Sequence, residues 1–147
     1  MKRLASFALT ALVAAGAAVF AEGKVLAADL STGVYVEDPG ICGQAWVLNT
    51  ISKRFDYQVR HVPNLPDVSI TDFHRIHQNG YLPAQERWPI GRRYCGATVA
   101  LSDGDHRDIW YLIEEGQGFA SIGDNVEFCV AGFDRWMVYN GQCRILR

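Results

Sequence analysis

The sequence has no run of like charge and no stripe of lysine and arginine interleaved with aromatic residues. Its 14 Lys and Arg residues are nearly balanced by 16 Asp and Glu residues, which gives a formal net charge of −2 at pH 7. Proteins that bind nucleic acid usually gather basic side chains on one face, because the phosphate backbone attracts positive charge. We therefore expect no nucleic-acid partner.

Short catalytic motifs are also missing. No Gly-x-Ser-x-Gly segment is present, so none of the serines lies in a nucleophile elbow. No Cys-x-x-Cys pair, internal repeat, low-complexity segment or domain linker occurs either. The sequence contains no complete catalytic constellation, and we expect no cofactor.

The N-terminus has the organisation of a secretory signal peptide. Lys2 and Arg3 precede an uncharged stretch at residues 4–20 that is rich in Ala, Leu and Val. A basic segment followed by an apolar run is typical of such a leader. The alternative is an uncleaved anchor helix, although the run is short and alanine-rich for a membrane span of roughly 20 residues.

Small residues before the mature chain predict where the leader is cut. We expect cleavage after Ala21, with Ala28 as the alternative, so that the signal peptide covers residues 1–21 or 1–28. No cysteine lies near these positions, which argues against a lipid-modified leader. Residues 29–147 are long enough for one core and form a single predicted domain, with no membrane span after cleavage.

All four cysteines follow the leader: Cys42, Cys95, Cys129 and Cys143. An even number of cysteines in an exported chain predicts two disulfides, which leaves no thiol for nucleophilic chemistry. Three pairings are possible. We favour Cys129–Cys143, because a turn at Asn140-Gly141 brings the tail back, and this leaves Cys42–Cys95. These features predict a bacterial protein that is periplasmic or secreted.

A hairpin at residues 92–115 is the clearest structural pattern. Residues 95–101 alternate with a period of two, and residues 102–105 have the composition of a turn. Residues 108–115 are apolar on both faces, which predicts a central strand covered on two sides, or on one side and by a dimer contact.

The segments before this hairpin predict a short strand at 34–36, a helix at about 43–53 and a strand at 55–61. Residues 68–78 are a strand or a helix, and their β-branched content favours a strand. Asn79-Gly80 predicts a turn, and Pro83 and Pro89 predict an irregular loop at 81–89.

After the hairpin, residues 124–133 are predicted as a short helix or a strand. Residues 136–139 and 142–146, joined at Asn140-Gly141, are predicted to form a terminal hairpin. Together the elements predict an α+β domain: an N-terminal helix packed on an antiparallel β-meander. In the order of its elements alone, this domain resembles cystatin-like and nuclear-transport-factor-like domains.

Two segments contain residue types that bind metal ions. His74 and His77 would point to opposite faces of the predicted strand, and no third ligand follows at a recognised spacing. In the acidic turn at 103–108, the sixth position of a calcium loop is Asp108 where the bend needs Gly. We therefore predict no metal site.

Carboxylates offer an alternative, enzymatic interpretation. Glu114 follows the apolar side chains Trp110 and Leu112, and Asp103, Asp105 and Asp108 lie in the preceding turn. A small hydrolase of cell-envelope polymers would use Glu114 and one of these aspartates as acid and base.

Aromatic residues favour a binding role instead. Trp46, Trp110 and Trp136 are predicted to fill the core. Tyr81 and Trp88 lie among charged residues in the segment 79–93, which ends with Arg92 and Arg93. The leading hypothesis is a non-catalytic binding module that uses Tyr81, Trp88, Arg92 and Arg93 to contact an unidentified protein or an envelope glycan. A structural envelope protein is the third possibility.

Overall fold

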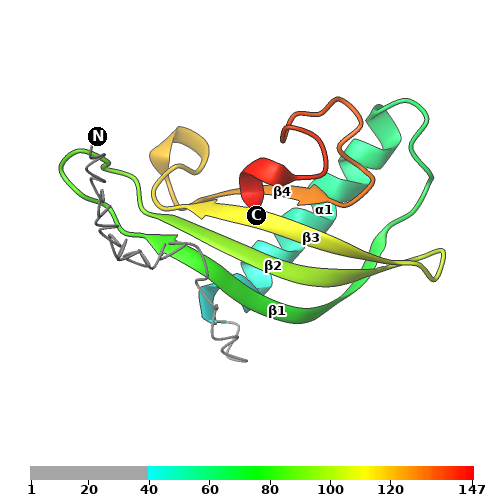
Figure 1. Cartoon of the computed structure of the whole chain (residues 1–147), viewed down its shortest axis with the longest axis horizontal. Helices are drawn as coiled ribbons and strands as arrows, with labels where there is room; N and C mark the ends of the chain where they lie inside the picture. The colour runs from blue at the N-terminus through cyan, green and yellow to red at the C-terminus, as the bar shows by residue number, and fades with distance from the viewer. Residues whose placement is uncertain (1–39) are drawn as a thin grey trace, which may run out of the picture. The chain divides into compact units, whose positions relative to one another are not determined.

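The computed structural model describes residues 40–147 (Figure 1). The predicted leader, its cleavage sites and the strand at 34–36 lie outside these residues. The described elements are, in order, η1 (Gly40–Gly43), α1 (Ala45–His61), β1 (Ile70–Leu82), β2 (Arg92–Leu101), β3 (His106–Glu114), η2 (Phe119–Ser121), β4 (Asn125–Val130) and η3 (Arg144–Leu146).

The four strands form one antiparallel sheet in the order β1-β2-β3-β4. Helix α1 lies along one face of this sheet, and η3 lies on the opposite face (Figure 1). We call these the helix face and the outer face. The predicted α+β fold, with a helix on an antiparallel meander, is confirmed in this outline.

Helix α1 is longer than the sequence predicted. Its buried side chains, Val47, Ile51, Phe55 and Val59, follow one another at a spacing of four. This spacing places all four on one stripe of an α-helix, which packs on the sheet. The helix ends at His61, where Val62 is extended and Pro63 follows.

The predicted strand at 55–61 is therefore wrong. Phe55, Tyr57, Val59 and His61 alternate with polar residues, but Phe55 and Val59 also continue the helical stripe. No glycine or proline interrupts residues 45–62, so the helix extends across the segment. Tyr57 and His61 stack on the exposed side, with ring centroids 3.8 Å apart.

Strand β1 confirms the preference for a strand at 68–78, but it extends to Leu82. The predicted turn at Asn79-Gly80 is wrong, because Gly80 pairs with Tyr94 of β2. The register shifts at this point, so the two residues form an irregularity within the strand instead of reversing the chain.

The hairpin of β2 and β3 is the one predicted from the sequence. Its register runs without a shift from Arg92↔Glu114 to Ala100↔His106. In its turn, Gly104 has φ +89° and Asp103 Oδ1 accepts a hydrogen bond from the Asp105 N–H at 3.0 Å.

Of the two alternatives for 124–133, the structure has the strand, β4. The predicted terminal hairpin is wrong, because no strand occurs at residues 136–146. Asn140 and Gly141 have the positive φ of a tight turn, but Gln142 and Cys143 also have positive φ. Consecutive left-handed residues coil the chain, so it does not return as a second strand.

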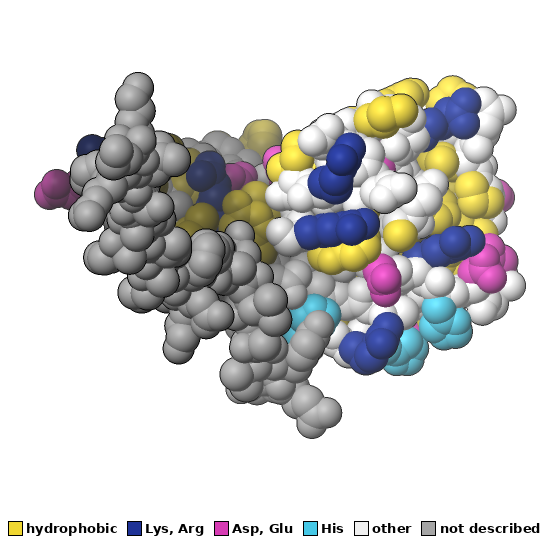
Figure 2. All heavy atoms as spheres, in the orientation of Figure 1, with side chains coloured by type: hydrophobic (Ala, Val, Ile, Leu, Met, Phe, Trp, Pro, Cys, Tyr) yellow, Lys and Arg dark blue, Asp and Glu magenta, His cyan; other side chains and the backbone are white. Residues whose placement is uncertain are grey.

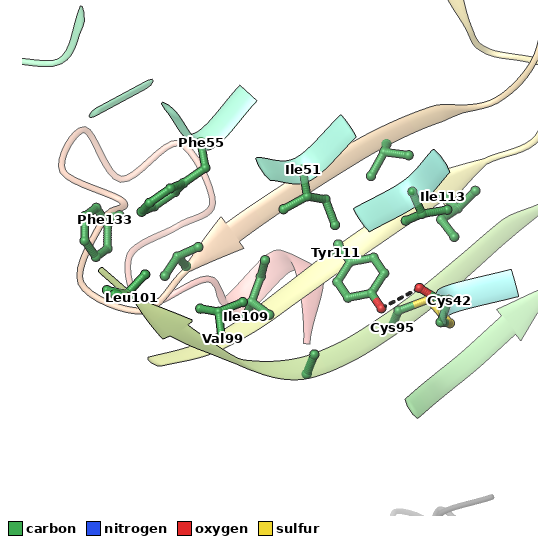
Figure 3. Packing of buried hydrophobic residues seen from close by; sticks show 14 of the residues in the cluster. Cys42, Ile51, Phe55, Cys95, Val99, Leu101, Ile109, Tyr111, Ile113 and Phe133 are labelled. Atoms are coloured by element: carbon green, nitrogen blue, oxygen red, sulfur yellow. Dashed lines mark hydrogen bonds between the residues drawn. A yellow bond between two sulfur atoms is a disulfide. The ribbon is translucent and has the colours of Figure 1, made fainter. Parts of the chain in front are cut away.

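The main core lies between α1 and the helix face of the sheet (Figure 3). Phe55 of α1 packs edge-to-face on Phe133, with ring centroids 4.9 Å apart. Tyr111 of β3 is fully buried, and its hydroxyl donates a hydrogen bond of 2.9 Å to the Cys42 carbonyl. Burial raises the pKa of Tyr111 well above its ordinary value, so the hydroxyl stays a donor at physiological pH.

A smaller cluster covers the outer face. Leu112 packs there with Cys129, Cys143 and Leu146, and Trp110 lies beside them. The Arg147 guanidinium lies 4.3 Å from the centroid of the Trp110 ring. Strand β3 is thus covered on both faces, by α1 on one side and by the chain's own C-terminal segment on the other.

Two disulfides attach the peripheral segments to the sheet. Cys42 of η1 is bonded to Cys95 of β2, and Cys129 of β4 is bonded to Cys143. This is the pairing favoured from the sequence. The closed loops span 53 and 14 residues, so loop-closure entropy gives each bond roughly 3 to 4 kcal/mol.

The hydrogen bond from Tyr111 to Cys42 can be tested by mutation. The Tyr111→Phe variant keeps the ring but leaves a buried carbonyl without its donor, which should lower the free energy of unfolding by about 1 to 3 kcal/mol. Urea denaturation measures this change. The exposed Tyr57→Phe is the matched control, and equal unfolding midpoints for both variants would contradict the assignment.

Candidate functional site

The connections β1–β2 and β3–β4 lie at the same end of the sheet (Figure 1). The first comprises residues 83–91 and the second residues 115–124. They meet at their bases, where the Glu115 N–H donates to the Gly91 carbonyl at 2.9 Å. This end of the sheet contains most of the binding residues expected from the sequence.

The first connection is a tight turn. Gln85 and Trp88 exchange two backbone hydrogen bonds, of 2.8 and 2.9 Å. The turn projects the Trp88 side chain, which is 62% exposed. Trp88 is therefore a large exposed aromatic side chain on an ordered backbone, as the sequence predicted for a contact residue.

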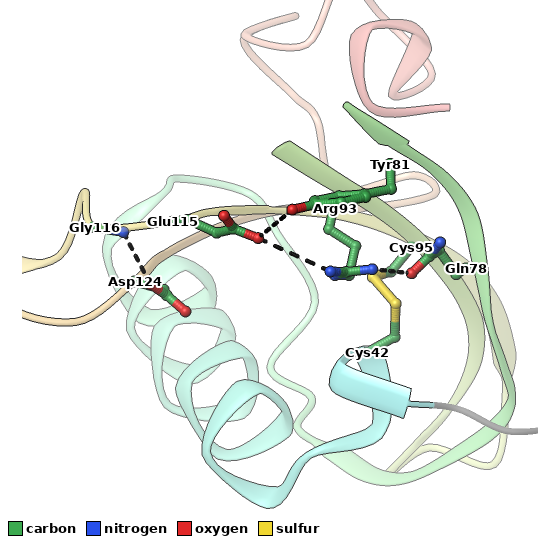
Figure 4. Close-up of polar contacts among 8 residues, drawn as sticks. All are labelled: Cys42, Gln78, Tyr81, Arg93, Cys95, Glu115, Gly116 and Asp124. Carbon is green, nitrogen blue, oxygen red and sulfur yellow. Dashed lines mark hydrogen bonds and ion pairs between the residues drawn. A yellow bond between two sulfur atoms is a disulfide. The ribbon is translucent and has the colours of Figure 1, made fainter. Parts of the chain in front are cut away.

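Tyr81 and Arg93 serve mainly to hold this loop (Figure 4). The Arg93 guanidinium stacks on the Tyr81 ring, 4.1 Å from its centroid, and donates a hydrogen bond to Gln78. Its Nη2 atom lies 3.9 Å from Glu115 Oε1, the oxygen that accepts a 3.1 Å hydrogen bond from the Tyr81 hydroxyl. Because the Arg93 side chain is only 16% exposed, it stabilises the loop base and offers a partner little surface.

Glycine at position 91 leaves room for the Glu115 carboxylate. A Cβ atom on Gly91 would lie 2.2 Å from Glu115 Oε2, well inside van der Waals contact. The bare backbone of Gly91 therefore lets the Glu115 carboxylate lie between the two connections.

Arg92 points to the other side of the sheet from Arg93. Its Nε atom donates to Glu114 Oε1 at 3.0 Å, and the two residues pair directly across β2 and β3. The structure therefore separates the four predicted contact residues: Trp88 and Tyr81 lie at the loop end, Arg93 beneath them and Arg92 on the outer face.

The second connection adds exposed apolar residues that the sequence analysis missed. Phe119 is 95% exposed and Ile122 is 79% exposed. The Gly118 N–H donates a 2.9 Å hydrogen bond to the Gly123 carbonyl, which closes the loop. The Asp124 side chain accepts a hydrogen bond from the Gly116 N–H through Oδ1. The sequence signal that could have indicated these exposed residues is their position between two glycines, Gly118 and Gly123.

We define the loop-end surface by the exposed apolar side chains of this end: Leu82, Trp88, Phe119 and Ile122. Tyr81 adds a partly exposed ring at its base. Ordered loops that present several large apolar side chains to solvent commonly form contact sites for other molecules.

The carboxylates of the hydrolase hypothesis do not come together. Asp105 and Asp108 lie at the start of β3 or just before it, and Glu114 lies at its end. Six residues of extended strand separate Asp108 from Glu114, or about 20 Å. Glycosidases hold their two carboxyl groups roughly 5 to 9.5 Å apart.

His74 and His77 lie on the same face of β1, contrary to the expectation for an i, i+3 pair on a strand. Their partners, Thr98 and Gly96, both belong to the outer face. A register shift lies between the two histidines, where Arg75 has φ +52°, and the extra residue restores the same orientation.

Histidine, arginine and acidic side chains gather on this part of the outer face (Figure 2). The His74 and His106 ring centroids are 6.2 Å apart, and His74 Nε2 lies 3.6 Å from Asp72 Oδ2. Within residues 40–147, no three His, Cys, Asp or Glu residues converge in a way that could hold a metal ion.

The core positions predicted for two tryptophans are wrong. Trp46 lies on the outer side of α1, where its Nε1 atom donates to Gln44. Trp136 is 64% exposed in the C-terminal segment.

In residues 40–147, no helix is both long enough and apolar enough to cross a membrane. No protein family, curated protein or solved structure matches this chain.

The contact between Tyr81 and Glu115 predicts a titration. The hydrogen bond to Glu115 raises the pKa of Tyr81 above its ordinary value of 10.0, with smaller contributions from burial and from the carboxylate charge. Removing the acceptor in Glu115→Ala should therefore lower the Tyr81 midpoint.

Phenolate absorbance between pH 9 and 12 measures this titration, and Tyr81→Phe identifies its contribution. Glu86→Ala removes a carboxylate from the neighbouring turn and is the control. An unchanged Tyr81 midpoint in Glu115→Ala would show that the two side chains are not in contact in solution.

Proposed function

We propose that the protein is an exported, non-catalytic binding module that contacts a protein partner through the loop-end surface. The observation that carries this proposal is the exposure of four large apolar side chains at this end of the sheet, three on the two connected loops and Leu82 at the end of β1. Burying them against a partner would contribute hydrophobic free energy, and the backbone hydrogen bonds within each loop reduce the entropic cost of binding.

A protein partner fits this chemistry better than an envelope glycan. Glycan sites pair aromatic rings with polar side chains, whereas Leu82 and Ile122 are aliphatic and offer nothing to a hydroxyl group. Aromatic anchors such as Trp88 and Phe119 commonly supply the binding hot spots of protein interfaces.

Two features support export. The basic and apolar N-terminus is typical of a secretory leader, and two disulfides favour an oxidising compartment such as the periplasm or the cell exterior. A helix packed on an antiparallel meander also fits the cystatin-like outline.

The test is affinity capture from an envelope extract of the producing organism, followed by titration with the purified partner. Trp88→Ala and Phe119→Ala should each weaken binding at least tenfold, since hot-spot truncations cost about 2 kcal/mol or more. Tyr57→Ala is the matched control, because the Tyr57 ring is 61% exposed but lies outside the loop-end surface.

Equal capture by Trp88→Ala and by the unmodified protein would remove the loop-end surface from the proposal. Binding to a glycan array that depends on Trp88, without a captured protein, would replace the protein partner by an envelope glycan.

A further inference from the structure

Strand β4 forms one edge of the sheet, and its free side lines a cavity of about 260 Å³. Three elements enclose this cavity: Arg54 and Gln58 come from α1, Phe128 from β4, and Trp136, Val138 and Tyr139 from the C-terminal segment. The cavity is separate from the loop-end surface, since none of its lining residues belongs to that surface.

The register of β3 and β4 shows which backbone groups face the cavity. The Ala131 N–H donates to the Asp108 carbonyl at 2.9 Å, and the pairing continues without a shift to Asn125. In an antiparallel pair, alternate residues point their N–H and C=O groups away from the partner strand. Those of Val126, Phe128 and Val130 therefore point to the free edge.

Two of these three carbonyls already accept hydrogen bonds. Arg54 Nη1 donates to the Val126 carbonyl, and the Phe133 N–H donates to the Val130 carbonyl at 2.9 Å. Among the described residues, nothing bonds to the outward N–H and C=O of Phe128. A donor and an acceptor of one residue thus face the cavity together, which is the arrangement that pairs with another extended chain.

The opposite edge of the sheet lacks such a site. Strand β1 has three register shifts, and each one disrupts the regular spacing of its outward groups. Bulges of this kind discourage pairing with a further strand. The regular β4 is therefore the edge that is suited to a partner.

The cavity walls indicate which side chains a partner would bring. Trp136 and Val138 are exposed and apolar, and a volume of about 260 Å³ suits a single apolar side chain better than a whole small-molecule ligand. The lining carries two positive charges, on Arg54 and Arg135, and one negative charge, on Asp134, whose carboxylate accepts the Tyr139 N–H at 3.2 Å. An acidic residue beside the apolar one complements this charge.

We propose that the edge of β4 binds an extended peptide segment of a partner protein as a further strand. One peptide residue pairs with Phe128 through two backbone hydrogen bonds, an apolar side chain fills the cavity, and an acidic side chain lies near Arg54 and Arg135. This mode of recognition derives its affinity from main-chain hydrogen bonds and its specificity from the pocket.

The probe is the peptide acetyl-Asp-Val-Phe-Val-Asp-amide, together with analogues that carry an N-methyl group at each residue in turn. Titration into ¹⁵N-labelled protein, followed by NMR, should shift the Phe128 amide and give a dissociation constant. Because one peptide residue pairs with Phe128, N-methylation should weaken binding at least tenfold at that residue and little at the others.

Variants of the protein locate the site. Val138→Glu places a carboxylate at the cavity mouth that repels the acidic peptide and should weaken binding at least tenfold. Val138 is exposed, so the fold should tolerate the change, and the amide spectrum verifies this. Trp88→Ala should bind the peptide as the unmodified protein does, which separates this site from the proposed function.

Three results would overturn the inference. The first is no binding by the unmodified peptide at millimolar concentration. The second is equal binding by all N-methyl analogues, which would indicate a side-chain pocket without strand pairing. The third is loss of binding in Trp88→Ala, which would place the peptide on the loop-end surface.

Discussion

The attachment of η1 to the sheet through Cys42 is the constraint on which the rest of the domain depends. The disulfide to Cys95 fixes the chain just before α1, and the Tyr111 hydroxyl bonds to the carbonyl of the same cysteine. Helix α1 begins only three residues later, so its position along the sheet is set at one end. Its stripe from Val47 to Val59 then packs on the helix face, and Arg54 and Gln58 donate hydrogen bonds to the Val126 and Phe133 carbonyls.

Much of the fold could be predicted because short-range patterns determine it. The hairpin of β2 and β3 has alternating residues and a turn with aspartate and glycine, and the turn residues Asn140-Gly141 favour the observed pairing of Cys129 with Cys143. The errors arose where two periodicities coincide or where the backbone departs from a regular strand. Phe55 and Val59 fit both a strand and a helix, and only the stripe from Val47 decides between them. The bulge at Arg75 places His77 on the same face as His74. The alternation of polar and apolar residues in the sequence does not predict this bulge.

The candidate site was predictable only in part, because the sequence does not show which side chains contact other residues of the same chain and which remain exposed to solvent. Trp88 is exposed in its loop as expected. Arg93, in contrast, forms an ion pair with Glu115 and stacks its guanidinium on the Tyr81 ring. Phe119 and Ile122 have the composition of core residues. They reach solvent because the glycines around them close a small loop that extends beyond the sheet.

The order of the two crosslinks along the chain affects how the protein matures. Each cysteine is bonded to the next one in the sequence, so the first pair is complete before the third cysteine has been synthesised. A polypeptide that emerges N-terminus first can therefore form both native bonds in turn. Bonds that form in this order do not have to be broken and exchanged afterwards.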